Sequence, residues 1–240
     1  MKYKAIFFDR DGTLTYFNPE KKAWRDSIIE SWSGRPFELL YEKMTALFTL
    51  ASEGKKPWYK TLEDERGFFR RYYRFLLMGE GVTENLDERA EVLFSELWCN
   101  NDKLLYPETV RVLKYFYDKG YKMGVISDTS PSLEYTLEQL DIAKYFTSFT
   151  ASSLVGAGKP DPVIFNAALS AQDVLAKDCI FVDDTEREAD GARALGFTSF
   201  HLNRENRDQT RWTITNLEQL VDFAESCERQ ERYDPKTVNT

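Results

Sequence analysis

Two short clusters of acidic residues could hold a metal ion and attack an electrophile. Asp9 and Asp11 flank a single arginine, and Asp183 and Asp184 are followed by Glu188. If these five carboxylates shared one crevice, their repulsion would raise their pKa values and destabilise the fold. A divalent cation would remove that repulsion. Oxygen ligands without Cys or His favour a hard ion, Mg²⁺ or Ca²⁺.

Two further polar groups follow apolar runs and suit phosphate chemistry. Ser127 and Asp128 come directly after the run at residues 121–126, and Lys159 lies in a Gly-Lys-Pro-Asp-Pro segment. Lys159 is the one obvious cation beside the acidic clusters. Mg²⁺ commonly takes one or two carboxylates and leaves room for water and a substrate phosphate, so these residues together favour a phosphoryl-transfer site.

The elements that must position these residues alternate between strands and helices. The apolar run at residues 3–8 is typical of a buried strand that ends at Asp9. Further strands are expected at 121–126, 146–151, 179–182 and 198–202, and helices at 107–119, 131–140, 161–171, 186–195 and 217–225. This alternation predicts an α/β fold with a doubly wound parallel sheet. Each polar cluster follows a strand, and the carboxyl ends of parallel strands form the usual site.

Local signals predict where some of these elements begin and end. Ser130 is a plausible N-cap, with Pro131 at the first position of its helix. The polar tail from Glu228 is expected to fray.

Residues 15–101 differ from the rest of the chain because they are helix-like, charged and very aromatic, and no strand is expected there. We therefore assign residues 1–15 and 102–240 to a catalytic core and 16–101 to an inserted helical cap. The aromatic residues, Tyr72 and Tyr73 among them, are expected to form the core of the cap. Arg66, Arg70 and Arg74 lie four apart, which favours a solvated helix face over a basic surface above the site.

Composition excludes several classes of function. There are 32 Lys and Arg against 40 Asp and Glu, a formal charge of −8, which disfavours nucleic-acid binding. Cys99, Cys179 and Cys227 are too scattered for a disulfide framework or a zinc cluster, and the single His201 excludes a multi-histidine metal site. With no signal peptide and no apolar run near 18 residues, we expect a cytoplasmic protein without a membrane partner. The oligomeric state cannot be predicted from the sequence.

Four motifs in order resemble those of the haloacid dehalogenase superfamily over about residues 3–15 and 104–204. Asp9-Arg10-Asp11-Gly12-Thr13-Leu14 matches the family's DxDGTL motif, and Ser127 and Lys159 match the second and third motifs. The fourth is similar to residues 183–188, but Asp183 stands where glycine is commonest and Glu188 replaces a second aspartate. The resemblance implies a helical cap between the first two motifs.

The resemblance also implies roles for these residues. Asp9 is expected to be the nucleophile that becomes an aspartyl phosphate, and Asp11 to protonate the leaving oxygen and then activate water. Mg²⁺ is expected on the carboxylates of Asp9 and Asp184 and the backbone carbonyl of Asp11. The expected phosphate contacts come from the Ser127 hydroxyl, the Lys159 ammonium and the backbone N–H groups of Gly12 and Asp128, while Asp183 and Glu188 support them.

An acid at position 11 favours phosphoryl chemistry, since the dehalogenase branch needs no proton to expel halide and lacks this residue. The expected function is Mg²⁺-dependent hydrolysis of a small phosphorylated metabolite. Three alternatives stay open: a sugar phosphomutase, a phosphonate hydrolase, and a receiver-like protein that holds phosphate on Asp9 without turnover. A phosphonate hydrolase would need a Schiff-base lysine from the cap, where several candidates occur: Lys21, Lys22, Lys43, Lys55, Lys56 and Lys60.

Overall fold

A six-stranded parallel sheet forms the centre of the larger part of the molecule. The computed structural model describes residues 2–54, 58–205 and 210–233, and within them the strand order is β5-β4-β1-β6-β7-β8. The strands are β1 (Ala5–Phe8), β4 (Lys122–Ser127), β5 (Ser148–Ala151), β6 (Cys179–Asp183), β7 (Thr198–Leu202) and β8 (Thr213–Ile214). The predicted doubly wound parallel sheet is therefore confirmed, with β8 as an additional short strand.

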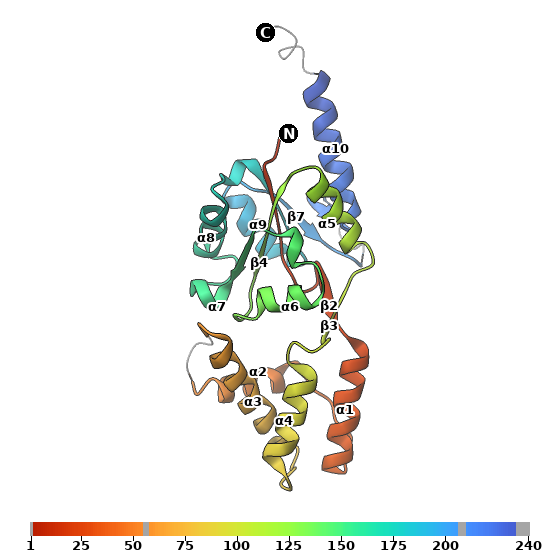
Figure 1. Cartoon of the computed structure of the whole chain (residues 1–240), viewed down its shortest axis with the longest axis vertical. Coiled ribbons are helices and arrows are strands. Elements are labelled where there is room, and N and C mark those ends of the chain that lie inside the picture. The colour runs from red at the N-terminus through yellow and green to blue at the C-terminus, as the bar shows by residue number, and fades with distance from the viewer. Residues whose placement is uncertain (1, 55–57, 206–209, 234–240) are drawn as a thin grey trace.

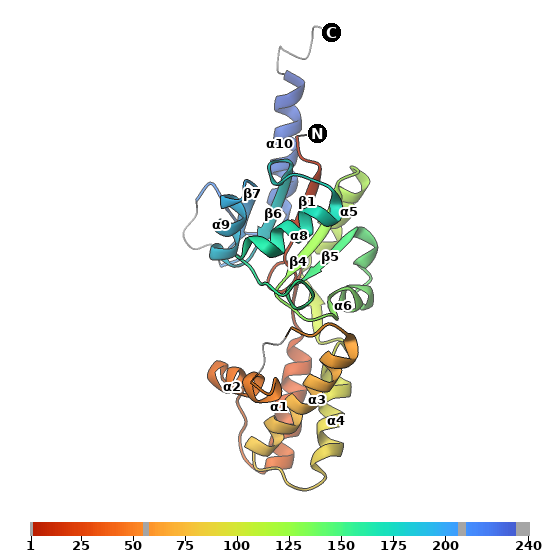
Figure 2. The same ribbon diagram turned by 90° about the vertical axis from the view of Figure 1, so that its left-hand side faces the viewer.

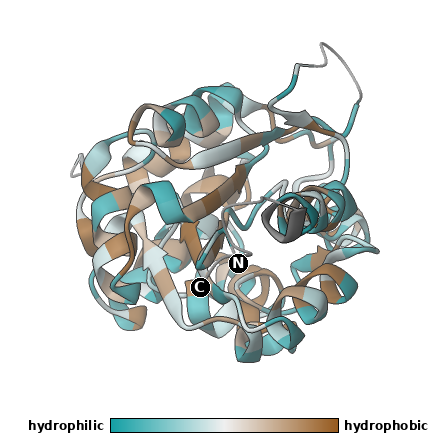
Figure 3. Cartoon of the chain, turned by 90° about the horizontal axis from the view of Figure 1, so that it is seen from above, coloured by the Kyte–Doolittle hydropathy of each residue, from teal (hydrophilic) through white to brown (hydrophobic). Residues whose placement is uncertain are grey.

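Helices cover both faces of this sheet, because side chains alternate along each strand. Ile6 and Phe8 of β1 belong to one apolar cluster, and Ala5 and Phe7 belong to another on the opposite face. The first cluster includes residues of α5 (Thr109–Asp118), α6 (Leu133–Gln139) and α10 (Glu218–Tyr233), and the second includes residues of α8 (Pro162–Gln172) and α9 (Glu186–Ala194). In Figure 3 the brown, apolar residues gather on the strands and on parts of the helices around them.

The strand register brings three polar loops to one edge. β1 lies between β4 and β6, and Phe8 is opposite both Val125 and Val182. The N–H of Asp9 donates to the Val182 carbonyl at 2.9 Å, so the first acidic residue directly continues the sheet. The loops after β1, β4 and β6 therefore begin side by side.

Four helices form a second layer beyond that edge of the sheet (Figures 1 and 2). They are α1 (Pro19–Ser33), α2 (Tyr41–Ala51), α3 (Leu62–Gly79) and α4 (Leu86–Leu97). Their buried residues, Tyr72 and Tyr73 included, make an apolar cluster separate from those of the sheet, as expected. Arg66, Arg70 and Arg74 pair with Glu63, Glu91 and Asp87 of the same helical layer, which confirms the solvated face.

The expectation that residues 15–101 contain no strand was wrong at one end. β2 (Thr15–Phe17) pairs antiparallel with β3 (Lys103–Leu105), and together they join the helical layer to the core. Each strand has only 3 residues, and its partner lies beyond the whole insertion. A pattern this short cannot be distinguished from a loop without knowledge of the pairing.

Two predicted helix ends also differ from the structure. α6 begins at Leu133 with Ser132 as its N-cap, two residues later than a Ser130 cap implies. α10 continues through Glu228 to Tyr233 instead of fraying, because Cys227 is buried and Glu228 pairs with Lys119 of the core. Residues 234–240 of the predicted tail lie outside the described residues. Among the described helices, none is both long and apolar enough to cross a membrane.

Candidate active site

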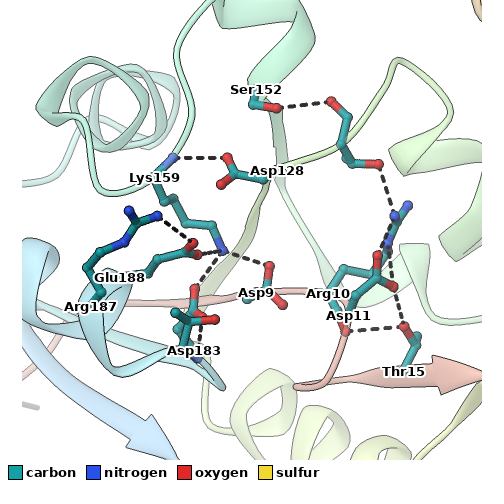
Figure 4. A network of polar contacts seen from close by, with 12 residues as sticks. Asp9, Arg10, Asp11, Thr15, Asp128, Ser152, Lys159, Asp183, Arg187 and Glu188 are labelled. Carbon is teal, nitrogen blue, oxygen red and sulfur yellow. Dashed lines mark hydrogen bonds and ion pairs between the residues drawn. The ribbon is translucent and has the colours of Figure 1, made fainter. Parts of the chain in front are cut away.

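The Lys159 ammonium lies among three carboxylates at the carboxyl edge of the sheet. Its Nζ is 2.8 Å from Asp9 Oδ1, 2.5 Å from Asp183 Oδ2 and 3.0 Å from Glu188 Oε2. The side chains of Lys159 and Asp183 are almost fully buried, and that of Asp9 is 7 % exposed. Figure 4 shows the lysine pointing down from its loop toward all three acids. The structure thus makes Asp183 and Glu188 direct partners of Lys159.

Burial in this acidic crevice changes the pKa values of the whole group. It raises the pKa of Asp9 to about 7; Lys159 opposes this change and Asp183 adds to it. Burial likewise raises the pKa of Asp183 to about 6. Burial would lower the pKa of Lys159, but the three carboxylates outweigh it and raise that pKa above its ordinary value. The crevice therefore holds more negative charge than one lysine can balance.

The Asp184 carboxylate lies against Gly12. A Cβ on Gly12 would fall 2.0 Å from Asp184 Oδ2, and φ at Gly12 is +81°, so only glycine fits here. Burial, followed by the charge of Asp9, raises the pKa of Asp184 to about 6. The Nε2 of His201 lies 3.1 Å from the Asp184 carbonyl and fixes the backbone at this point.

The Asp11 side chain is turned away from Lys159 in this structure (Figure 4). Its carboxylate accepts hydrogen bonds from Arg10 Nη2 at 2.7 Å and Thr15 Oγ1 at 3.0 Å, and it pairs with Lys103 Nζ at 2.8 Å. Burial would raise the pKa of Asp11, but Arg10 and Lys103 outweigh it and hold that pKa well below its usual range. Proton donation by Asp11 therefore requires its carboxyl group to leave these two cations.

The residues predicted to bind phosphate border the same crevice, but the Gly12 N–H donates to another backbone group. Ser127 ends β4 and is buried, and Asp128 Oδ1 accepts the backbone N–H of Lys159 at 2.9 Å. A side chain at Gly158 would collide with Asp128, so this glycine keeps the two loops together. The Gly12 N–H donates to the Thr15 carbonyl at 2.7 Å. It is thus already engaged, and its role toward phosphate stays a prediction.

The donor atoms of the crevice fit a magnesium ion. The Asp9 and Asp184 carboxylates border the crevice, and the Asp11 backbone carbonyl belongs to the same loop as Asp9. Among the described residues there is no group of three or more Asp, Glu, His or Cys side chains placed to hold a metal. Two carboxylates, with water and substrate completing the shell, are the set that Mg²⁺ commonly takes. Ca²⁺, which prefers 6–8 oxygen ligands, suits so small a protein set less well.

Glu65 of the helical layer is a contact that sequence reasoning missed. Its buried carboxylate accepts hydrogen bonds from Ser132 N at 2.8 Å, Ser132 Oγ at 2.6 Å and Trp98 Nε1 at 3.1 Å. Ser132 follows the Ser127 loop of the core, so this carboxylate joins α3 to the second motif. It takes the place of the local cap that was predicted at Ser130.

We expect Glu65→Ala to lower the free energy of unfolding by about 1–3 kcal/mol, because the buried Ser132 N–H loses its acceptor. Thermal and urea unfolding measure this change. Glu63→Ala is the matched control on the same turn: Glu63 is 79 % exposed, and its removal should change stability by less than about 0.5 kcal/mol. Equal effects of the two substitutions would contradict this interpretation of Glu65.

Comparison with known proteins shows the family to which the chain belongs. The family model described as haloacid dehalogenase-like hydrolase matches residues 3–196, so the chain belongs to this family and is a hydrolase. It is 25 % identical over 196 residues to phosphoglycolate phosphatase 1 of Pseudomonas aeruginosa, covering 80 % of this chain and 66 % of that protein. It is 26 % identical over 238 residues to a glyceraldehyde 3-phosphate phosphatase of Methanocaldococcus jannaschii, covering 94 % and 99 %.

A solved structure shares the whole architecture. The 2-haloacid dehalogenase of Pseudomonas syringae pv. Tomato superposes with a TM-score of 0.69 and 21 % identity over 93 % of this chain and 99 % of that one. Sheet and helical layer therefore both follow the family fold, with the cap between the first two motifs. At this identity the likeness concerns the fold alone, and the reaction must be argued from the side chains.

Proposed function

We propose that this protein is a Mg²⁺-dependent phosphatase that hydrolyses small phosphate monoesters through an aspartyl phosphate on Asp9. The observation that carries the proposal is the buried Asp9 carboxylate bound to Lys159 at 2.8 Å, with a second acid, Asp11, two residues further on. A nucleophile and a nearby acid are what an ester with a poor leaving group requires. The two relatives named as phosphatases support the same class of substrate.

In the proposed mechanism Asp9 attacks phosphorus and the ester oxygen leaves. Lys159 orients the Asp9 carboxylate and offsets the charge of the phosphoryl group, while Ser127 and the Asp128 N–H donate to its oxygens. Asp11 gives a proton to the departing oxygen, then takes one from the water that cleaves the aspartyl phosphate. Asp9, Asp184 and the Asp11 carbonyl would hold Mg²⁺, which supplies further charge compensation.

The proposed cap, residues 16–101, would exclude bulk water and select the ester. β3 connects this cap to the core and carries Lys103, which holds Asp11 in the observed orientation. A shift of the cap at β3 would move Lys103 and so remove one of the two cations that hold the Asp11 carboxylate. This motion would couple movement of the cap to proton donation by Asp11.

A phosphometabolite panel tests the proposal. We expect phosphate release from at least one small ester with Mg²⁺, none after EDTA treatment, and none from the Asp9→Asn protein used as a blank. An isomerised sugar phosphate without phosphate release would instead indicate a phosphomutase, and a phospho-form that is stable for hours would indicate a receiver-like protein.

Lys60 keeps the phosphonate hydrolase open as a second candidate. Its Nζ reaches the core and donates to the carbonyls of Ser153 at 2.6 Å and Leu154 at 2.8 Å. Lys21 and Lys43 instead pair with acids of the cap itself, while Lys55 and Lys56 lie outside the described residues. Borohydride trapping of a carbonyl-bearing phosphonate on Lys60 would favour this alternative over a phosphatase.

Magnesium binding is expected to weaken as the pH falls below about 7. Asp9 and Asp184 have pKa values raised to about 7 and about 6, so Mg²⁺ must displace protons from them at lower pH. The apparent affinity should fall by up to about tenfold per pH unit for each proton displaced. Calorimetric titrations at pH 6 and pH 8 in buffers of different ionisation enthalpy count these protons. Equal Mg²⁺ affinity at the two pH values, with no proton release at either, would contradict this prediction.

A further inference from the structure

Arg204 holds the backbone of the loop after β1 through two of its carbonyls. It follows β7 by two residues and donates from Nε to the Gly12 carbonyl at 3.2 Å and from Nη2 to the Thr13 carbonyl at 2.8 Å. These two contacts fix the planes of two successive peptides in the first motif. Nothing in the proposed mechanism uses this arginine.

The guanidinium itself is held on two further sides. Its Nη1 donates to Glu108 Oε1 at 2.7 Å, and its central carbon lies 3.4 Å from the centroid of the Tyr106 ring. Tyr106 in turn packs on Tyr16, with ring centroids 5.0 Å apart. Because three of its donors and one face of the guanidinium are engaged in this way, Arg204 makes a rigid support.

The peptide that Arg204 fixes carries the glycine against which Asp184 rests. Because Gly12 leaves no room for a Cβ beside the Asp184 carboxylate, a small rotation of the loop would displace that carboxylate. A cleft of about 440 Å³ lies beside these residues and reaches Arg204 itself. The Gly12 and Thr13 carbonyls are thus held by an arginine that borders this cleft.

We propose that Arg204 is a positioning residue, which rests on the proposed function: it sets the Gly12–Thr13 backbone and, through Gly12, the Asp184 carboxylate where Mg²⁺ binds. It touches neither the reacting atoms nor the metal ligands directly. Its loss acts by loosening the loop, so metal affinity and turnover fall together and a guanidinium ion restores both.

The test compares Arg204→Ala with the wild-type protein. We expect the Mg²⁺ dissociation constant, measured by calorimetry, to rise about tenfold or more, and kcat to fall by a similar factor with KM nearly unchanged. Amide hydrogens of residues 10–15 should exchange faster. Millimolar guanidinium, entering through the cleft, should reverse these changes in Arg204→Ala and have no effect on the wild type. Arg111→Ala, which removes a 70 % exposed arginine of the core surface, is the control and should match the wild type.

Two milder variants keep the test valid if Arg204→Ala does not fold. Glu108→Gln weakens the support of the guanidinium, and Arg204→Lys keeps the charge but loses the paired donors, so both should show smaller changes in the same direction. Unchanged Mg²⁺ affinity and unchanged exchange at residues 10–15 in the folded variants would overturn the proposal, even if their melting temperatures fall. Wild-type protein that releases no phosphate would refute the proposed function alone, because the exchange measurement needs neither metal nor substrate.

Discussion

Asp9→Asn is expected to abolish phosphate release while the protein stays folded. Removing the nucleophile of a covalent mechanism typically costs about four to six orders of magnitude in kcat. Asparagine keeps the shape of the side chain but cannot attack phosphorus at a useful rate. Steady-state phosphate release with Mg²⁺ measures the loss, and mass spectrometry of acid-quenched protein should find the phosphoryl adduct on the wild type and none on the variant.

The same substitution should stabilise the metal-free protein, and this second effect separates a catalytic loss from misfolding. The folded-state pKa of Asp9, about 7, lies above its ordinary value of 3.8, so ionised Asp9 destabilises the folded state at neutral and higher pH. This destabilisation is absent below about pH 4 and complete above about pH 7. Asp9→Asn should therefore raise the free energy of unfolding by about 1–3 kcal/mol at pH 8, and not at pH 4.

Mg²⁺ should reverse the order of stability of the Asp9→Asn variant and the wild type. It stabilises the wild type by binding to the folded state, whereas the variant lacks one of the proposed ligands and gains less. Melting temperatures with and without Mg²⁺ at pH 8 provide the comparison. A variant that retains full activity would refute the covalent mechanism, and one that melts below the metal-free wild type at pH 8 would refute the interpretation of the pKa.

The residues that could be predicted from the sequence are those placed by the sheet. Asp9, Ser127 and Asp183 each end or directly follow a buried strand, so a parallel arrangement was sufficient to bring them to one edge. Lys159 joined them because its segment follows the strand at the end of the sheet. For these residues, the alternation of strands and polar segments along the chain is enough to predict which side chains lie close together.

The residues that were missed have partners far away in the chain and ordinary neighbours nearby. Arg204 contacts Thr13 across 191 positions, and Glu65 contacts Ser132 across 67. Neither residue interrupts a pattern: Glu65 lies in the acidic first turn of α3, and Arg204 lies in a polar loop. Lys103 belongs to a strand too short to recognise. Only the packing of the loops and the cap on the core determines these contacts.

Arg10 shows how a recognised motif can still hide a contact. Arg10 stands between the two acids, at the position of the DxDGTL motif where any residue is allowed, so no role was predicted for it. In the structure its buried guanidinium binds Asp11 and donates to Thr129 Oγ1 at 2.9 Å. The orientation of Asp11 therefore depends on a residue of the first motif, a residue of the second-motif loop and Lys103 of β3.

Asp11→Asn is expected to separate the two chemical steps. Asparagine cannot protonate an alkoxide, so kcat/KM for an alkyl phosphate should fall by about 10²–10⁴. p-Nitrophenolate leaves without help, so its release in the first step should be nearly unaffected. Hydrolysis of the aspartyl phosphate still needs a base, so the variant should release a burst of about one nitrophenolate per active site and then turn over slowly. Rapid-mixing absorbance at 400 nm or so follows the burst, and acid quenching should recover the phosphoryl group on Asp9.

Asp102→Asn, a neighbour of the same acidic region that the mechanism does not use, is the control and should show neither burst nor selective loss. If alkyl and nitrophenyl esters lose activity equally and no burst is seen, Asp11 orients the site without transferring protons, and the acid must be sought among the residues of the cap.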